Sequence, residues 1–543
     1  MPIRRKVPVL LCSAMLILAV ETNALAQNLL TRHVRPAVMS GKASFMNLMP
    51  ATRSLRLDIV LALRNQSELR DLAQELYDPQ SPSFHHFLSV AEFTQRFGPT
   101  EEDYAAVVRF LMQNGISVTG TSPNRVVLNV SGTVASIEKA FQVRIGVYQH
   151  PSEARTFYSP DREPSPTGLY VPLWHISGLD DFSLPRPASL RRSLEQSGKA
   201  TGSGPLGNFL GSDMRAAYYG GTALTGAGQS VGLLEFGTYN IADVQTYFAN
   251  VGQPNSVPVN AISTDGSSVS CAGQCDDTEQ VLDIEEAISM APGMSQVRVY
   301  VSDSSDVSIF NRMATDNVSK SLSCSWGWDP ADPASDDPVF LEFALQGQTL
   351  FVASGDGGAY GKARQDIYPA DDALVVSVGG TILTTSGSGG SWESETAWSD
   401  SGGGFAAGIL IPKYQKTAGV ITTANQGSKI WRNCPDVAAE ANDDNYICYS
   451  GTCGGGWGGT SFAAPRWAAF MALLNQQSVA SGNSTLGFIN SGLYTLGSGK
   501  YYSTYFHDIT SGSNGKYSAQ PGYDLVTGWG SPNGAGLLNA SVP

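Results

Sequence analysis

Histidine is scarce in the later part of this chain. The 543 residues include only six histidines, five of them at or before position 175, and the last is His507. A serine nucleophile needs a base to take its proton, and that base is most often histidine. A serine nucleophile in the later part of the chain is therefore expected to depend on something other than the usual histidine.

Positive charge is also scarce there. Residues 204–543 hold 13 Lys and Arg against 31 Asp and Glu, a net charge of −18, whereas residues 1–203 carry +4. This balance excludes nucleic acid as an expected partner. It fits two alternatives: a solvated acidic surface, or an enzyme adapted to acid, where protonated carboxylates repel one another less.

Long apolar runs are absent after the N-terminus. Arg4, Arg5 and Lys6 precede an apolar stretch, Val7–Val20, which is too short for a confident membrane span, and Ala24-Leu25-Ala26 fits a cleavage site. Residues 1–26 are predicted to be a signal peptide. The chain is expected to be secreted, extracellular or periplasmic, with no membrane segment after signal removal, and to act as a monomer.

Cysteines are few, and one of the seven, Cys12, lies in the signal segment. The other six suggest disulfides in an exported chain. Cys271–Cys275 and Cys448–Cys453 are close enough to pair locally. Cys324 and Cys434 could pair or remain buried thiols. Zinc is a weaker interpretation, because no histidines accompany them.

The chain divides into three parts after the signal. Residues 27–182 mix helical and strand-like patterns, which predicts a small α+β open sandwich. Residues 183–204 are rich in Pro, Gly and Ser and predict an exposed linker. Within it, Arg191-Arg192 is either a processing site or part of an ordinary basic linker.

Residues 205–543 alternate short apolar strands with helices. Strands are expected at 231–236, 296–301, 349–353 and 374–378, and helices at 277–290, 338–346 and 461–476. This alternation predicts an α/β fold with a parallel sheet covered by helices on both faces.

Ser461 is the candidate nucleophile. It follows Gly458-Gly459-Thr460 and opens an apolar helix, where amide groups and the helix dipole favour a developing oxyanion. The alternative is a glycine turn capped by Thr or Ser.

Acidic residues offer a base. Glu279 and Asp283 are four residues apart on one helical face, and two carboxyl groups within reach can share a proton. Asp276 and Glu286 fall near the same face, so spacing does not select the pair, and a solvated acidic face is the alternative. Asp356 follows a predicted strand, where open α/β sheets place their sites, but it could simply stabilise a tight turn.

Together these motifs resemble the sedolisins, serine-carboxyl peptidases with a subtilisin-like fold. Four segments carry the resemblance: GGTSFAAP (458–465), EQVLDIE (279–285), SGDGG (354–358) and LLEFG (233–237). It implies Ser461 as nucleophile, Glu279 as base with Asp283 as its partner, Asp356 in the oxyanion site and Glu235 as an accessory acid. It also implies Ser325, Trp326 and Gly327 in the substrate cleft.

The resemblance extends to both ends of the exported chain. The segment at 77–100 is similar to an activation prodomain, which would act as an intramolecular inhibitor or chaperone. Near the C-terminus, carboxylates and turns suit calcium, which prefers hard oxygen ligands. The implied ligands are the Asp508 and Asp524 side chains and the carbonyls of Ile509, Gln520 and Gly522. A pair of Asx turns is the alternative.

We therefore predict a secreted, calcium-binding, acid-acting endopeptidase that cleaves proteins or peptides and is made as a zymogen. A weakly basic prodomain on an acidic enzyme suggests an electrostatic clamp that acid loosens. Two alternatives remain open: an ordinary subtilisin with a histidine base, and a non-catalytic secreted binding protein.

Overall fold

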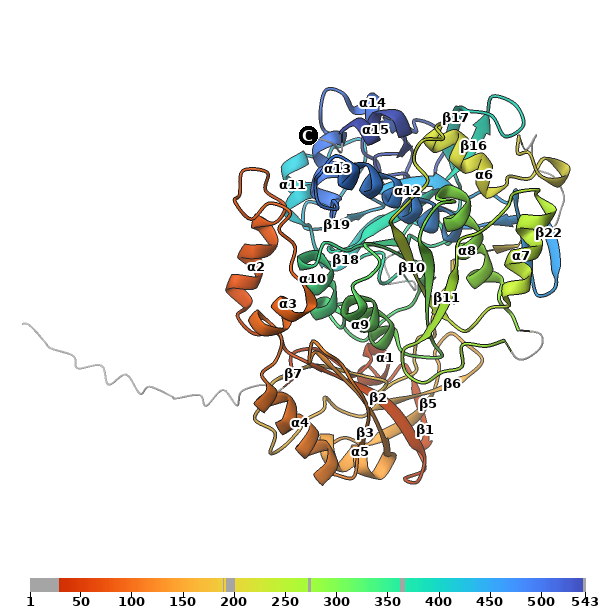
Figure 1. The fold of residues 1–543 in the computed structure, drawn as a ribbon. Helices are drawn as coiled ribbons and strands as arrows, with labels where there is room; N and C mark the ends of the chain where they lie inside the picture. The colour runs from red at the N-terminus through yellow and green to blue at the C-terminus, as the bar shows by residue number, and fades with distance from the viewer. Residues whose placement is uncertain (1–28, 189, 192–200, 272–274, 362–366, 541–543) are drawn as a thin grey trace, which may run out of the picture.

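The computed structural model describes residues 29–188, 190–191, 201–271, 275–361 and 367–540. The predicted signal peptide, 1–26, lies outside these residues. Within them, no helix combines the length and the apolar character needed to cross a bilayer. Figure 1 shows a smaller N-terminal unit packed against one side of a larger α/β unit.

An eight-stranded sheet organises the larger unit. Seven strands follow the order β11-β12-β10-β13-β15-β16-β17, and β20 also pairs with β16. All these pairs are parallel except β16 with β17. The strands are β10 (Ser230–Phe236), β11 (Val259–Ser263), β12 (Gln296–Ser302), β13 (Ser321–Cys324), β15 (Thr349–Ala353), β16 (Val376–Thr385), β17 (Trp392–Ala397) and β20 (Val437–Glu440). This confirms the predicted fold class.

Helices cover this sheet. They are α6 (Gly211–Met214), α7 (Ile241–Asn250), α8 (Thr278–Met290), α9 (Asp306–Asp316), α10 (Asp337–Leu345), α11 (Lys413–Ala418), α12 (Thr460–Ala480), α13 (Asn490–Gly497), α14 (Tyr502–Tyr505) and α15 (Gly534–Ala540). Helices α8 and α12 are buried along almost their whole lengths. A helix that is buried on all sides forms part of the core, so these two are held rigidly.

The N-terminal unit is an open sandwich, as predicted. A four-stranded antiparallel sheet has the order β3-β4-β2-β7, and a second sheet has the order β1-β5-β6. Its elements are α1 (Pro36–Met39), β1 (Ser44–Leu48), β2 (Ser54–Leu61), α2 (Gln66–Glu75), α3 (Val90–Arg96), α4 (Glu101–Gln113), β3 (Ser117–Thr121), β4 (Val127–Thr133), α5 (Val134–Phe141), β5 (Ile145–Gln149), β6 (Thr156–Pro160) and β7 (Leu173–Ser177). A capping box begins α3, with Ser89 and Glu92 bonded reciprocally.

The sequence placed most of these elements but not all of their ends. The strand expected at 374–378 begins at Val376 and runs on to Thr385, and α12 extends beyond the expected end to Ala480. Strands β11, β13, β17 and β20, half of the large sheet, were not expected. Both cysteine pairs close as predicted, while Cys324 and Cys434 are separate buried thiols.

Candidate active site

Ser461 lies at the start of α12, where the chain leaves a hairpin. The hairpin consists of β21 (Asn445–Tyr449) and β22 (Thr452–Gly458). Gly459 joins β22 to the helix with a φ of 141°, a backbone conformation that only glycine adopts readily. The side chain of Ser461 is buried, and its Oγ donates to the carbonyl of Ser325 at 3.2 Å.

Pro465 frees the carbonyl of Ser461. In a regular helix that carbonyl would accept from the amide four residues later, but proline has no N–H. The Oγ of Ser325 lies 3.3 Å from the Ser461 carbonyl and 2.8 Å from Oδ1 of Asp283. Ser325 therefore links the serine segment to the acidic helix α8.

The candidate carboxylates lie close together near Ser325. Asp283 on α8 and Glu235 at the end of β10 are fully buried, and a hydrogen bond joins their carboxyl groups. Burial, and then the charge of Glu279, raise the pKa of Glu235 well above its usual range. Burial, and then the charge of Glu235, raise the pKa of Asp283 likewise. Two such groups hold one proton between them.

The structure distinguishes these acids from their neighbours. Glu279 lies one turn before Asp283 on α8 and is 3% exposed. Glu286 instead pairs with the buried Arg466 at 2.6 Å, and Asp276 is exposed at the start of the helix. Burial and the cation beside Glu286 therefore favour Glu279 and Asp283 over Asp276 and Glu286 as the candidate pair.

Asp356 reaches the same helix end from the sheet. It follows β15, and its Oδ1 accepts from both the backbone amide and the hydroxyl of Thr460, each at 2.8 Å. The Thr460 hydroxyl in turn accepts from Gly355 at 3.0 Å. Asp356 is thus held beside the amide of Ser461. Thr460, a residue that the sequence did not single out, is what holds it there.

The linker passes directly over these groups. Its segment β8 (Arg186–Pro187) pairs antiparallel with β14 (Trp326–Gly327), and β9 (Leu190–Arg191) pairs antiparallel with Trp457 and Gly458 of β22. Trp326 also donates its ring N–H to Glu235 at 3.0 Å. The predicted cleft residues 325–327 therefore hold an extended chain with their backbone.

Ala188 lies between the two paired segments. Its amide donates to the carbonyl of Ser325 at 2.9 Å, and its carbonyl accepts from the Ser461 amide at 2.9 Å. A cavity of about 170 Å³ beside it is lined by Ala353, Gly355, Asp356 and Tyr360, among others. The Ala188 carbonyl thus accepts from the amide of Ser461, the candidate nucleophile, near the acidic side chain of Asp356. The carbonyl of a substrate would be positioned in the same way. No sequence pattern pointed to Ala188.

The candidate calcium residues also come together. The Asp508 carboxylate accepts from the Gly522 amide at 3.2 Å, and the Asp524 carboxylate accepts from the Gln520 amide at 3.0 Å. Burial raises the pKa of Asp524 to about 7. Burial, and then the charges of Asp508 and Asp524, raise the pKa of Tyr502, so both carboxylates lie near its hydroxyl. The buried carboxylate of Asp524 and the half-buried carboxylate of Asp508 fit a hard divalent cation.

His507 does not belong to the catalytic cluster. It lies in the two-residue strand β23 (Phe506–His507), paired with β24 (Ser531–Pro532), and stacks on Trp392 with ring centroids 3.9 Å apart. Burial lowers its pKa to about 4. Its described contacts are with Trp392 of β17 and with β24, which does not favour the histidine-based alternative.

Known proteins resemble the chain over most of its length. Residues 42–182 match the family described as "Pro-kumamolisin, activation domain". Kumamolisin from Bacillus sp. (strain MN-32) is 31% identical, covering 91% of this chain and 93% of that protein. Sedolisin from Pseudomonas sp. (strain 101) is 28% identical, covering 92% and 89%.

A solved structure is also similar to this chain. It is that of Pseudomonas sedolisin, a serine-carboxyl proteinase, complexed with two molecules of pseudo-iodotyrostatin. It aligns with a TM-score of 0.54 at 29% identity and covers 63% of this chain and 98% of that chain.

Proposed function

This chain belongs to the sedolisin family of serine-carboxyl peptidases, and from that premise we propose that it is the zymogen of a secreted, acid-acting endopeptidase. The observation that carries the proposal is the position of Ala188. Its carbonyl lies on the Ser461 amide while Ser325 connects Ser461 to a buried carboxyl pair. The mature enzyme is proposed to act as a monomer on proteins or peptides.

The proposed reaction proceeds through an acyl-enzyme. The Oγ of Ser461 attacks the scissile carbonyl carbon while Glu279 takes the hydroxyl proton. The Ser461 amide and the Asp356 carboxyl, in its protonated form, donate to the oxyanion. The C–N bond then breaks as Glu279 returns the proton to the leaving amine, and water hydrolyses the ester. Asp283 and Glu235 hold Glu279 in place, and a carboxylate base stays ionised in acid that would protonate histidine.

The same geometry supports the zymogen. With Ala188 in the position of a substrate residue, the linker blocks the cleft until it is cut, and we place that cut on the carboxyl side of Ala188. This site differs from Arg191-Arg192, which the sequence suggested. The N-terminal unit is proposed to act as inhibitor or chaperone. A non-catalytic binding protein would not need the buried carboxyl pair, which is costly to maintain.

Calcium is proposed as a structural ion. The Asp508 and Asp524 side chains with the carbonyls of Ile509, Gln520 and Gly522 would hold it. When bound, it would offset the charge of the Asp508 and Asp524 carboxylates and fix the C-terminal loop.

Acid processing of the purified precursor tests the proposal. Wild type should convert to mature enzyme with a new N-terminus directly after Ala188, identified by mass spectrometry, and should then hydrolyse a denatured protein. Ser461→Ala should stay intact at the same pH. If Ser461→Ala is processed at the wild-type rate without added protease, self-cleavage by Ser461 is wrong.

A further inference from the structure

A second pair of buried carboxyl groups lies away from the catalytic cluster. Asp243 on α7 is 4% exposed, and Asp277, which precedes the first residue of α8, is fully buried. The two carboxyl groups accept from adjacent backbone amides, those of Gly451 and Ser450, so they lie close together, and such a buried pair can share one proton. Neither residue has a part in the reaction proposed above.

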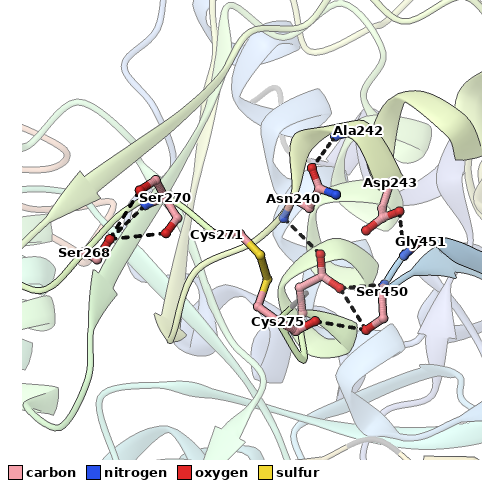
Figure 2. The surroundings of a disulfide bond; sticks show 10 residues. Asn240, Ala242, Asp243, Ser268, Ser270, Cys271, Cys275, Ser450 and Gly451 are labelled. Carbon is pink, nitrogen blue, oxygen red and sulfur yellow. Dashed lines mark hydrogen bonds between the residues drawn. A yellow bond between two sulfur atoms is a disulfide. The ribbon is translucent and has the colours of Figure 1, made fainter. Parts of the chain in front are cut away.

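Both carboxyl groups bind the same turn. The turn Ser450-Gly451 connects β21 to β22, and Figure 2 shows it beside the Cys271–Cys275 disulfide. The Ser450 amide donates to Oδ1 of Asp277 at 2.8 Å, and the Gly451 amide donates to Oδ1 of Asp243 at 3.0 Å. The Ser450 hydroxyl donates to the carbonyl of Cys275 at 3.1 Å.

The pair also fixes the start of α7. The other oxygen of Asp277 accepts from the Asn240 amide at 2.9 Å. At the far end of α7, the Asn250 side chain lies 3.2 Å from the sulfur of Cys453, which closes the hairpin through the Cys448–Cys453 disulfide. The three elements that meet at the pair are thus α7, α8 and the β21–β22 hairpin.

These connected elements carry opposite halves of the catalytic site. Helix α8 carries Glu279 and Asp283, two and six residues after Asp277. Strand β22 holds the linker at Trp457 and Gly458 and leads through Gly459 directly to Ser461. The separation between acid and serine therefore depends on how firmly the hairpin is held to the start of α8.

We propose that Asp243 and Asp277 form a proton-dependent latch, in which one shared proton holds the Ser450-Gly451 turn against α8 and so positions Ser461 relative to Glu279 and Asp283. The inference rests on the proposed peptidase function. Asp243 and Asp277 are positioning residues, since they touch neither substrate nor reacting atoms.

The surrounding charges make the shared proton necessary. The hairpin residues 445–458 include no charged side chain, and Asp243 is the only one within α7. From α8, the fully buried Glu285 faces the pair and accepts from the Cys448 amide at 3.4 Å, and the charges of Asp243 and Asp277 help to raise its pKa. The exposed Asp276 adjoins Asp277 in the chain. No described lysine or arginine forms an ion pair with either latch carboxyl.

The sign of the pH dependence follows. Burial, and then the charge of Asp277, raise the pKa of Asp243 in the folded state. The folded state thus binds a proton that the unfolded chain releases, so stability from the latch is present in acid and is lost as pH rises through the folded pKa. With the proton gone, two adjacent buried negative charges repel each other, and the hairpin moves away from α8.

The pH profile of Asp243→Asn tests the latch. Asparagine can accept from Gly451 and donate to Asp277 at any pH, so it should move the alkaline limb of kcat/KM upward by about one pH unit, tenfold in proton concentration. Asp276→Asn removes a neighbouring exposed charge and should leave the limb in place. If wild type is active and both variants share its alkaline limb, the latch is wrong. An inactive wild type would instead contradict the proposed function.

Hydrogen exchange gives a readout independent of activity. In the full-length Ser461→Ala precursor, protection factors of residues 448–453, corrected for intrinsic exchange, should fall about tenfold or more from pH 4 to pH 8. The fall should be absent in Asp243→Asn and present in Asp276→Asn. Constant protection in the parent precursor across this range would overturn the proposal even if Asp243→Asn fails to fold.

Discussion

At the scale of single residues, the proposed role of each acid depends on whether a cation lies beside it. Glu286 has Arg466 and is neutralised, whereas Glu235 and Asp283 have each other and must keep a proton. Glu279 is buried in the same region, but the carboxyl pair that shares a proton consists of Glu235 and Asp283. These surroundings separate a base from its proton-sharing neighbours, which is how paired titratable groups take different roles.

Glu279→Gln should nearly abolish self-processing at acid pH. The amide cannot accept the proton of Ser461, and general base catalysis contributes about 10²–10⁴-fold to rate. The measurement is the rate at which purified precursor converts to mature enzyme on gels. Glu393→Gln, at an exposed glutamate, should convert at the wild-type rate. Equal rates in both variants would remove Glu279 from the mechanism.

At the scale of elements, the site is assembled from the ends of strands and helices. Strands β10 and β15 deliver Glu235 and Asp356, and α12 begins with Thr460 and Ser461. Periodicity predicted these elements because buried strands and helices have distinct apolar patterns. It could not predict that the linker pairs with β14 and β22, since backbone pairing carries no sequence signature of its own.

Ala188→Pro should stop cleavage at the proposed processing site. Proline lacks the amide that bonds to the Ser325 carbonyl, so the paired geometry at the cleft is lost. Conversion at acid pH should slow at least about tenfold or shift to another bond, by loss of positioning. Leu184→Ala, at an exposed linker residue outside the paired segments, should process normally. Unchanged N-termini in Ala188→Pro would contradict the assignment.

At the scale of the whole molecule, both a buried apolar cluster and polar contacts hold the N-terminal unit against the larger unit. Asn124 donates to Glu342 at 2.7 Å, and Ser308 donates to Asp58 at 3.2 Å. Burial raises the pKa of Glu342 to about 8, so it is already protonated near neutral pH. In the Arg32–Asp332 ion pair the arginine is exposed to solvent, and ion pairs at the surface contribute about 0–1 kcal/mol. These contacts give little support to the expected electrostatic clamp.

A buried histidine pair is better placed to respond to acid. His33 and His175 stack with ring centroids 4.5 Å apart, and His175 bonds to Thr31 at 2.8 Å. Burial, then the charges of His33 and Arg35, lower the pKa of His175 well below its usual range. Below a pH of about 6.5 an unfolded chain therefore binds a proton that the folded unit excludes, so folded stability falls as pH falls.

His175→Gln should make the zymogen more resistant to acid. Glutamine can keep the bond to Thr31 but gains no charge, so the midpoint pH of self-processing should drop by about half to one unit. The midpoint is measured by following self-processing across about pH 3–7. Histidine and carboxyl groups titrate over this range. His86→Gln, at an exposed prodomain histidine, should not move the midpoint. An unmoved midpoint in His175→Gln would assign the trigger to other groups.

Calcium removal should destabilise the mature enzyme. A chelator should lower Tm by about 5–10 °C, because an ion at 100–1,000 times its Kd contributes about 3–4 kcal/mol. Asp524→Asn should show the lower Tm without chelator and no further drop with it, measured by scanning calorimetry. Equal Tm values with and without chelator in wild type would contradict the calcium site.

The sequence by itself determined the α/β class, the two local disulfides, the serine at a helix start and the acids on one helical face. These are local properties, fixed by periodicity, spacing and turn-forming residues. Only the tertiary structure decided that Arg466 removes Glu286 from the candidates, that Ser325 joins Ser461 to Asp283, and that Ala188 lies on the Ser461 amide. Each of these contacts joins segments far apart in the chain, and whether a carboxyl group is ionised depends on the neighbours that folding brings to it.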